Sequence, residues 1–171
     1  MELQLDTSDS KDIVFAKIKD YLSGLSLNET SVDSSRPWGG FYVIDEAQTA
    51  LFISTFFPDL QTEQIIRGGK LSPKILIVEP DKRLSWQYHN RREELWCVIS
   101  GPVGVITGET DQQGAVQEVH AGDVVQFGTN IRHRLVGLKT WGIVAEIWQH
   151  TDLDNPSDES DIVRVADDFG R

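Results

Sequence analysis

Four residues in two separated stretches of the chain have side chains of the types that bind metal ions in proteins. Gln87 and His89 stand two positions apart, Glu94 follows shortly after them, and His133 lies far downstream. Alternate residues of a β-strand point to the same face, so Gln87 and His89 face the same way. Two imidazoles, one carboxylate and one amide oxygen can surround a divalent ion and leave a position open for substrate. The spacing therefore predicts a metal site that is open to catalysis.

The position of Glu94 supports this prediction. Strand alternation places Glu94, Trp96 and Val98 on one face. Because the two apolar side chains belong in a core, the carboxylate is expected to point inward with them, and a buried carboxylate without a partner is costly. A divalent metal would satisfy it; zinc is the first candidate, and manganese, iron, cobalt and nickel are alternatives.

Basic residues gather around the same two stretches, although the whole chain carries a formal net charge of -11. One interpretation is that they are solvated surface charges, which is the usual fate of Lys and Arg. The other is a local cationic pocket that binds a small anion such as a phosphate ester. Their coincidence with the metal motif favours the pocket. The residues concerned are Arg67, Lys70, Lys74, Lys82, Arg83, Arg91, Arg92, Arg132 and Arg134.

The composition argues against several classes of protein. Apolar residues make up 39% of the 171-residue chain and charged residues 25%, which is ordinary for one soluble domain. No stretch approaches the roughly 20 apolar residues that span a bilayer, and the N-terminus lacks the pattern of a secretory signal. Cys97 is the only cysteine, so no internal disulfide can form and a cytoplasmic location is expected. The acidic charge disfavours nucleic acid, so the expected partner is a small molecule.

The apolar pattern predicts one helix followed by many short strands. Val14, Ile18 and Leu22 recur at helical spacing, and either Asp9 or Ser10 can cap the start of the helix. This helix packs either on the outside of a barrel or against a second copy in a homodimer. Residues 26–35 are a polar connection. The strands predicted after it span residues 41–44, 50–53, 74–79, 84–89, 95–100, 103–107, 115–119, 124–127, 134–136 and 142–148.

Turn signals such as Gly101-Pro102 separate these strands, which is typical of an all-β sandwich or barrel. The sequence therefore predicts an all-β fold with an N-terminal helix. It divides the chain into a helical extension over residues 1–35 and a barrel domain over residues 36–171, which ends in an acidic tail.

The spacing of the metal motif resembles that of a known superfamily. The segments from Gln87 to Gly101 and from Gly122 to His133 resemble the paired motifs of the cupins. This resemblance implies a double-stranded β-helix, the cupin jelly-roll barrel, with the metal inside it. In the first motif the superfamily usually has His where this chain has Gln87.

A narrower resemblance is to the type II phosphomannose isomerase domain, also called mannose-6-phosphate isomerase, which is usually fused to a mannose-1-phosphate guanylyltransferase. The resemblance covers residues 36–171, and its motifs appear in order. Nothing in this chain resembles the Gly-rich nucleotide loop of the guanylyltransferase, so the implied activity is the isomerase alone. The matching segments are residues 36–39, 84–89, 92–101 and 133–135, Glu146, and residues 161–164 and 168–171.

The resemblance implies a metal-dependent aldose–ketose isomerase that acts on a sugar phosphate. That reaction moves a proton between C1 and C2 of the sugar, while a metal stabilises charge on two oxygens and Arg or Lys holds the phosphate. The candidate catalytic residues are Lys74, Arg92 and Arg171. The other candidates are Arg134 and Arg164 for binding substrate, and Gln87, His89, Glu94 and His133 for binding metal.

Other functions stay open at this point. The isomerase family usually has histidines where this chain has Asn90, Arg91 and Leu95, so the substrate could be another sugar phosphate or a free sugar. Two His and one carboxylate also serve iron, which would make the protein a different cupin enzyme, such as an oxygenase. A third alternative is a sugar-binding cupin without catalysis. The tail and the Arg-Pro-Trp-Gly element that begins at Arg36 favour the isomerase.

Overall fold

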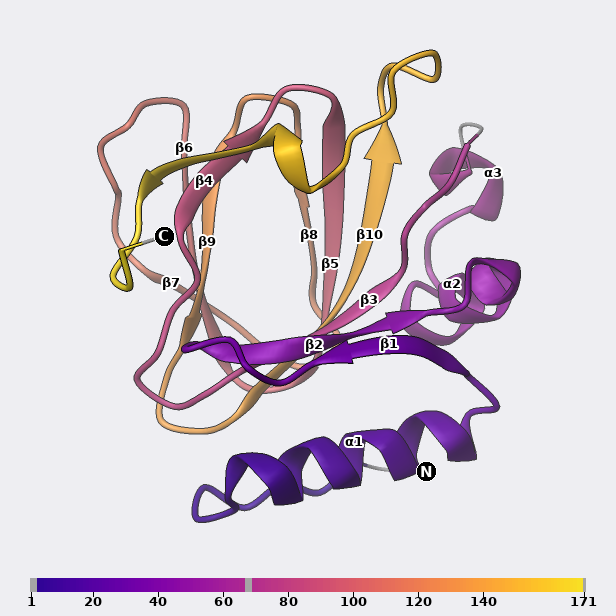
Figure 1. Ribbon diagram of the computed structural model, residues 1–171, viewed down its shortest axis with the longest axis vertical. Helices are drawn as coiled ribbons and strands as arrows, with labels where there is room; N and C mark the ends of the chain where they lie inside the picture. Colours follow the sequence, from indigo (N-terminus) through magenta and orange to yellow (C-terminus); the bar gives the residue numbers. More distant parts are fainter. Residues whose placement is uncertain (1–2, 67–68, 171) are drawn as a thin grey trace.

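Two antiparallel β-sheets form opposite walls of a barrel in the computed structural model, which describes residues 3–66 and 69–170 (Figure 1). The first sheet has the strand order β1-β2-β3-β10-β5-β8 and the second has the order β11-β4-β9-β6-β7. The predicted all-β barrel is confirmed. The strands are β1 (Glu29–Asp33), β2 (Gly39–Ile44), β3 (Lys74–Val78), β4 (Trp86–His89), β5 (Arg92–Ser100), β6 (Val103–Gly108), β7 (Gln117–Val119), β8 (Val124–Phe127), β9 (Arg132–Gly137), β10 (Gly142–His150) and β11 (Ile162–Ala166). The helical elements are α1 (Lys11–Gly24), η1 (Glu46–Gln48), α2 (Thr49–Phe56), α3 (Thr62–Ile65) and η2 (Glu159–Asp161).

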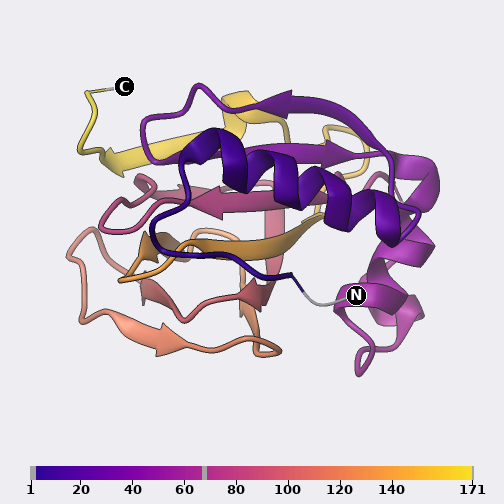
Figure 2. The ribbon, with the colours of Figure 1, turned by 90° about the horizontal axis from the view of Figure 1, so that it is seen from below.

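Helix α1 lies along the outer face of the first sheet (Figures 1 and 2). Ser10 caps it, because its hydroxyl accepts a hydrogen bond from a backbone N–H of the first turn at 3.4 Å. Val14, Ile18 and Leu22 are buried in an apolar cluster that they share with Ile75 of β3. The predicted packing on the outside of the barrel is confirmed, and a contact with a second copy stays a prediction. No helix in the described ranges has the length and apolar character needed to cross a membrane.

Residues 50–53 belong to helix α2, where the sequence predicts a strand. A four-residue apolar run fits either a strand or a buried helix. Phe52, Ile53 and Phe56 are buried in the cluster beneath the first sheet, and their spacing is that of one helix face. The strand prediction is wrong because so short a run carries no clear period.

Strand β1 lies within residues 26–35, which the sequence predicts to be a polar connection. It pairs antiparallel with β2 at the edge of the first sheet. Thr30, Ser31 and Val32 are exposed, so the strand lacks the apolar alternation by which strands are recognised. Residues 1–35 thus add a strand to the barrel wall, and their separation from residues 36–171 as a distinct region stays a prediction.

The interior of the barrel changes from apolar to polar along the strands. Leu76 of β3 pairs with Val144 of β10, and both are buried between the sheets. Two residues further along, Lys74 pairs with Glu146, and strand alternation gives this pair the same interior face. The polar row marks the end of the barrel at which the candidate site lies.

Candidate metal centre

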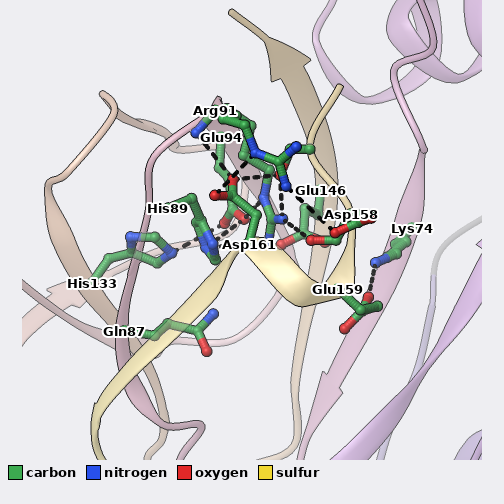
Figure 3. A network of polar contacts seen from close by, with 12 residues as sticks. Lys74, Gln87, His89, Arg91, Glu94, His133, Glu146, Asp158, Glu159 and Asp161 are labelled. Atoms are coloured by element: carbon green, nitrogen blue, oxygen red, sulfur yellow. Dashed lines mark hydrogen bonds and ion pairs between the residues drawn. The ribbon is translucent and has the colours of Figure 1, made fainter. Parts of the chain in front are cut away.

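Three of the four predicted metal ligands come together inside the barrel. His89 ends β4, His133 lies on the neighbouring strand β9, and Glu94 reaches them from β5 in the facing sheet. Their ligand atoms all lie within 4.8 Å of one another, and all three side chains are buried. Figure 3 shows the two imidazoles and the carboxylate converging on one place. Both walls of the barrel therefore contribute to one centre.

The hydrogen bond of His133 Nδ1 leaves the other ring nitrogen available as a metal ligand. Its Nδ1 lies 3.0 Å from the carbonyl oxygen of Ile131, which can only accept, so Nδ1 carries the proton. In the neutral imidazole, Nε2 then has a free lone pair. That atom has no hydrogen-bond partner in the described structure and lies 3.2 Å from Glu94 Oε2. Two acceptors that face each other in a buried place fit a cation between them.

His89 approaches the other carboxylate oxygen. Its Nε2 lies 3.0 Å from Glu94 Oε1, and burial lowers the pKa of His89, which favours the neutral imidazole that a metal requires. Burial also raises the pKa of Glu94, but its close contacts with His89, Arg92 and His133, of which the Arg92 guanidinium is always charged, outweigh it and hold the pKa well below its usual value. The carboxylate is therefore ionised. The donor set of two nitrogens and one carboxylate suits zinc, iron and related divalent ions.

Gln87 lies beside these ligands without joining them. It stands directly opposite His133 in the pairing of β4 with β9, so both side chains share the interior face. Its Oε1 accepts a hydrogen bond of 2.6 Å from the Ser85 hydroxyl, and Figure 3 shows its amide apart from the converging group. The structure thus brings three predicted ligands together and leaves the fourth adjacent.

Arg92 is buried against the same carboxylate. Its Nε donates to Glu94 Oε1 at 2.8 Å, and its Nη2 lies 3.2 Å from His89 Nε2. Its Nη1 donates to the Ser157 hydroxyl at 2.9 Å and to the carbonyl oxygen of Asp158 at 3.2 Å. The segment before η2 therefore fixes the guanidinium, which in turn orients Glu94.

A cavity of about 60 Å³ opens beside the ligands, and Glu94 and Gln87 line it. Three of the five predicted basic residues also line it: Lys74, Arg92 and Arg164. Lys74 Nζ lies 3.2 Å from a carboxylate oxygen of Glu159. Arg164 stands opposite Gln87 in the pairing of β11 with β4. Within the described residues Arg164 has no hydrogen bond or ion pair, so its charge is free to bind an anion.

The structure places Arg134 outside this cavity. Its guanidinium donates to the carbonyl oxygen of Leu84 at 2.6 Å, to Gln113 Oε1 at 3.0 Å and to Asp168 Oδ1 at 2.7 Å. Neighbouring residues of a strand point to opposite faces, so Arg134 faces away from the site that His133 faces. Arg134 therefore contacts the tail through Asp168, and its role in binding substrate stays a prediction. Arg171 lies outside the described residues, and its catalytic role stays a prediction.

Glu146 is a buried acid of the site that was not among the predicted site residues. It lines the cavity, and the indole N–H of Trp96 lies 3.1 Å from both Glu146 Oε1 and Glu94 Oε2. Burial and the neighbouring Glu94 raise the pKa of Glu146 to about 8. A signal was present in the sequence, because Glu146 interrupts the otherwise apolar run from residue 143 to residue 148.

Comparisons with known proteins agree with this architecture. KdgF from Halomonas sp. is 12% identical with a TM-score of 0.50, and the match covers 72% of this chain and 90% of that one. A variant of the oxalate decarboxylase OxdC from Bacillus subtilis is 12% identical with a TM-score of 0.55, covering 79% and 30%. A Cupin 2 conserved barrel domain protein from Salinispora arenicola CNS-205 is 23% identical with a TM-score of 0.40, covering 48% and 63%.

The identities to KdgF and OxdC are low, so these two likenesses concern the fold alone, and the TM-score of the Salinispora protein is too low for a conclusion. The chain covers less than two thirds of the length of the Salinispora protein and less than one third of OxdC. No curated protein matches the chain. The family model described as mannose-6-phosphate isomerase C-terminal matches residues 49–167. Because that match spans more than half of the chain, the protein belongs to the mannose-6-phosphate isomerase C-terminal family, and its barrel is a cupin barrel.

Proposed function

We propose that this protein is a metal-dependent aldose–ketose isomerase that acts on a sugar phosphate, with mannose 6-phosphate the first substrate to test. One observation carries the proposal. Three buried ligands of the right types, His89, Glu94 and His133, come together, and Glu94 also lines a cavity whose wall holds a second acid and an unpaired cation. Membership of the mannose-6-phosphate isomerase C-terminal family supports the same reaction class.

His89, Glu94 and His133 would hold the metal, and Gln87 stands close enough in the fold to orient a ligand or substrate beside it. A divalent ion bound there, zinc first and manganese, iron, cobalt or nickel as alternatives, supplies a Lewis acid for the two oxygens of the sugar. Arg92 keeps Glu94 ionised and fixed through its 2.8 Å hydrogen bond. Its catalytic contribution in this proposal is to position that carboxylate.

The proton between C1 and C2 needs a carrier that reaches the cavity. Glu146 is placed for this role, because it lines the cavity and is held by the N–H of Trp96 at 3.1 Å. Its ionised form, which becomes populated as the pH approaches its pKa of about 8, would accept the proton from C2 and return it to C1. Lys74 pairs with Glu146 across the two strands and is the second candidate, although Glu159 binds its ammonium group at 3.2 Å.

Arg164 would bind the phosphate. Of the cations that line the cavity, Lys74, Arg92 and Arg36 each pair with a carboxylate, whereas Arg164 pairs with none among the described residues. A guanidinium with free donors can hold a phosphate through two parallel hydrogen bonds. The free-sugar alternative predicts instead that Arg164 is dispensable.

Two other functions have support of their own. The set of two His and one carboxylate also suits an iron-dependent cupin enzyme such as an oxygenase. A sugar-binding cupin without catalysis is supported by Arg92, which supplies Glu94 with a positive charge even without a metal. Turnover separates these functions from the isomerase, since neither of them moves a proton between C1 and C2.

The experiment that tests the proposal compares two neighbouring acids. Glu94→Gln should remove both bound metal and isomerase activity towards mannose 6-phosphate, because the centre loses its only carboxylate. Glu93→Gln is the matched control, since Glu93 is the adjacent residue on β5 and alternation turns it to the other face. It should keep both properties. Metal content by elemental analysis and ketose formation are measured on the same samples.

A further inference from the structure

Trp148 occupies the boundary between the metal cavity and a second pocket. It lies on β10 directly opposite Glu94 of β5 and is only 6% exposed. The second pocket has a volume of about 470 Å³ and shares Trp148, Lys74 and Glu159 with the cavity. The Trp148 side chain therefore lines both spaces.

The N–H group of this indole has no hydrogen-bond partner among the described residues. A buried tryptophan N–H usually finds an acceptor, because leaving it unsatisfied costs free energy. Three other buried tryptophans follow that rule. Trp86 donates to the carbonyl oxygen of Asp111 at 2.9 Å, Trp96 donates to Glu94 and Glu146, and Trp141 donates to the carbonyl oxygen of Asp9 at 3.2 Å.

The Trp148 ring is nevertheless held firmly. Lys74 Nζ lies 3.6 Å from a ring centroid and Arg92 Cζ lies 3.5 Å from one, so two cations pack against the indole. Both are anchored in turn, Lys74 by Glu159 and Arg92 by Glu94. The unpaired donor is thus fixed in position while it lacks an acceptor, which is the arrangement of a preformed binding group.

The charges around the second pocket indicate what that acceptor is. The pocket is lined by two lysines and by four acids, Asp45, Glu46, Asp158 and Glu159. This excess of carboxylates disfavours a phosphate group and suits neutral hydroxyl groups, which can accept from an N–H and donate to a carboxylate. The free cation for an anionic group, Arg164, lines the metal cavity and is absent from this pocket's lining.

We infer that Trp148 and Glu159 form a hydroxyl-binding subsite for the part of a polyhydroxylated substrate that lies away from the metal. The Trp148 N–H donates to a substrate hydroxyl oxygen, and the Glu159 carboxylate accepts from a hydroxyl group. The inference rests on the proposed function for the identity of the substrate as a sugar phosphate. It deepens that function by making the hydroxyl pattern, besides the phosphate, a determinant of specificity.

Trp148→Phe tests the inference, because it removes the N–H and keeps an aromatic ring beside the two cations. The probes are mannitol 1-phosphate, an open-chain polyol phosphate that cannot isomerise, and inorganic phosphate. Titration calorimetry should give about a tenfold weaker Kd for the polyol phosphate, the size expected for one lost hydrogen bond. The affinity for inorganic phosphate should not change, since the N–H is not needed to bind an anion. The thermal midpoint should fall somewhat, because the smaller ring leaves a cavity in the packed interior.

Trp86→Phe is the matched control. It loses a hydrogen bond within the protein, to Asp111, so it should lower the thermal midpoint and leave the Kd of the polyol phosphate unchanged. A second readout is the indole N–H resonance of Trp148 in NMR spectra of the wild-type protein. It should shift when mannitol 1-phosphate is added and stay in place when inorganic phosphate is added.

The outcomes separate this subsite from the proposed function. The subsite is overturned if Trp148→Phe binds mannitol 1-phosphate as tightly as the wild type, or if it loses equal affinity for inorganic phosphate. A wild-type protein that binds no polyol phosphate overturns it as well. Binding that depends on Trp148 without any isomerisation supports the subsite and contradicts the isomerase. Isomerisation with an unchanged KM in Trp148→Phe supports the isomerase and overturns the subsite.

Discussion

His133 Nε2 lies 3.2 Å from Glu94 Oε2, and the contact between His133 Nδ1 and the Ile131 carbonyl turns the Nε2 lone pair toward that carboxylate. Two acceptors in a buried place repel each other unless a cation stands between them. This relationship, together with the approach of His89 to Oε1, is the physical basis for a metal centre in this barrel.

Metal should therefore stabilise the fold. Zinc at 100 times its Kd should raise the free energy of unfolding by about 2.7 kcal/mol, because an ion that binds only the native state shifts the equilibrium by mass action. Chelation should reverse the gain, and Glu94→Gln should abolish it. Urea denaturation with and without zinc measures the effect. Equal midpoints for the wild type in both conditions would count against the centre.

Arg92 and the metal should substitute for each other electrostatically. Arg92→Met leaves Glu94 without its hydrogen-bonded cation, which in a buried place costs about 3 kcal/mol. The cost should be smaller in the zinc-loaded protein, because the ion neutralises the same carboxylate. Denaturation of wild type and variant, each with and without zinc, gives the coupling. Additive effects would show that guanidinium and metal act independently.

Low pH should weaken the contacts by which the Asp161 carboxylate holds the turn between β4 and β5. Burial alone raises the pKa of Asp161, but hydrogen bonds from Ser157 and from the backbone of Arg91 and Asn90 outweigh it and lower the pKa to about 2. A depressed pKa stabilises the fold above the unfolded value near 3.8, and the contribution is lost as pH falls from about 4 to about 2. Asp161→Asn should lose about 2 kcal/mol at pH 7.

The loss in Asp161→Asn should shrink as the pH falls through that window, because the wild-type carboxylate is then protonated too. Asp154→Asn is the control, since Asp154 is exposed in the loop that precedes η2. It should change stability little at any pH. A pH-independent loss in Asp161→Asn would mean that shape, and not charge, accounts for the effect.

Arg164 should act on substrate affinity more than on turnover. Arg164→Met should raise KM for mannose 6-phosphate about tenfold or more with a smaller change in kcat, because a phosphate remote from the reacting carbons is bound similarly in the ground and transition states. Arg132→Met is the control, since Arg132 pairs with Asp111 and packs over Tyr88. An unchanged KM in Arg164→Met would favour a free sugar as substrate.

Some of the site follows from sequence because strand geometry is periodic. Alternation brings Glu94 inward with Trp96, and the structure places both beside His133. The same rule applied to Arg134 turns it away from the face of His133, whereas its proposal as a substrate ligand came from its position beside His133 in the family-like motif. The amphipathic period of α1 was sufficient for its position, whereas its packing on the barrel, one of two alternatives, was decided only by the structure.

Other features depend on partners that are remote in sequence. The free N–H of Trp148 is recognisable only once its neighbours are known, and the elevated pKa of Glu146 arises from burial beside Glu94. Gln87 accepts a hydrogen bond from Ser85 that cannot be predicted from the spacing of residues in the sequence. The helix at residues 50–53 and the edge strand β1 carry too little periodicity to be assigned locally.

Proton exchange at C2 of the sugar is the most direct test of the account. The metal-loaded protein is incubated with mannose 6-phosphate in deuterium oxide, and NMR follows the loss of the C2 proton signal. The account predicts exchange in the wild type and in Glu93→Gln, with loss of exchange by at least about 100-fold in Glu94→Gln and in Glu146→Gln. A metal-replete wild-type protein that exchanges no C2 proton, with mannose 6-phosphate or with any other hexose or heptose phosphate, would contradict the isomerase.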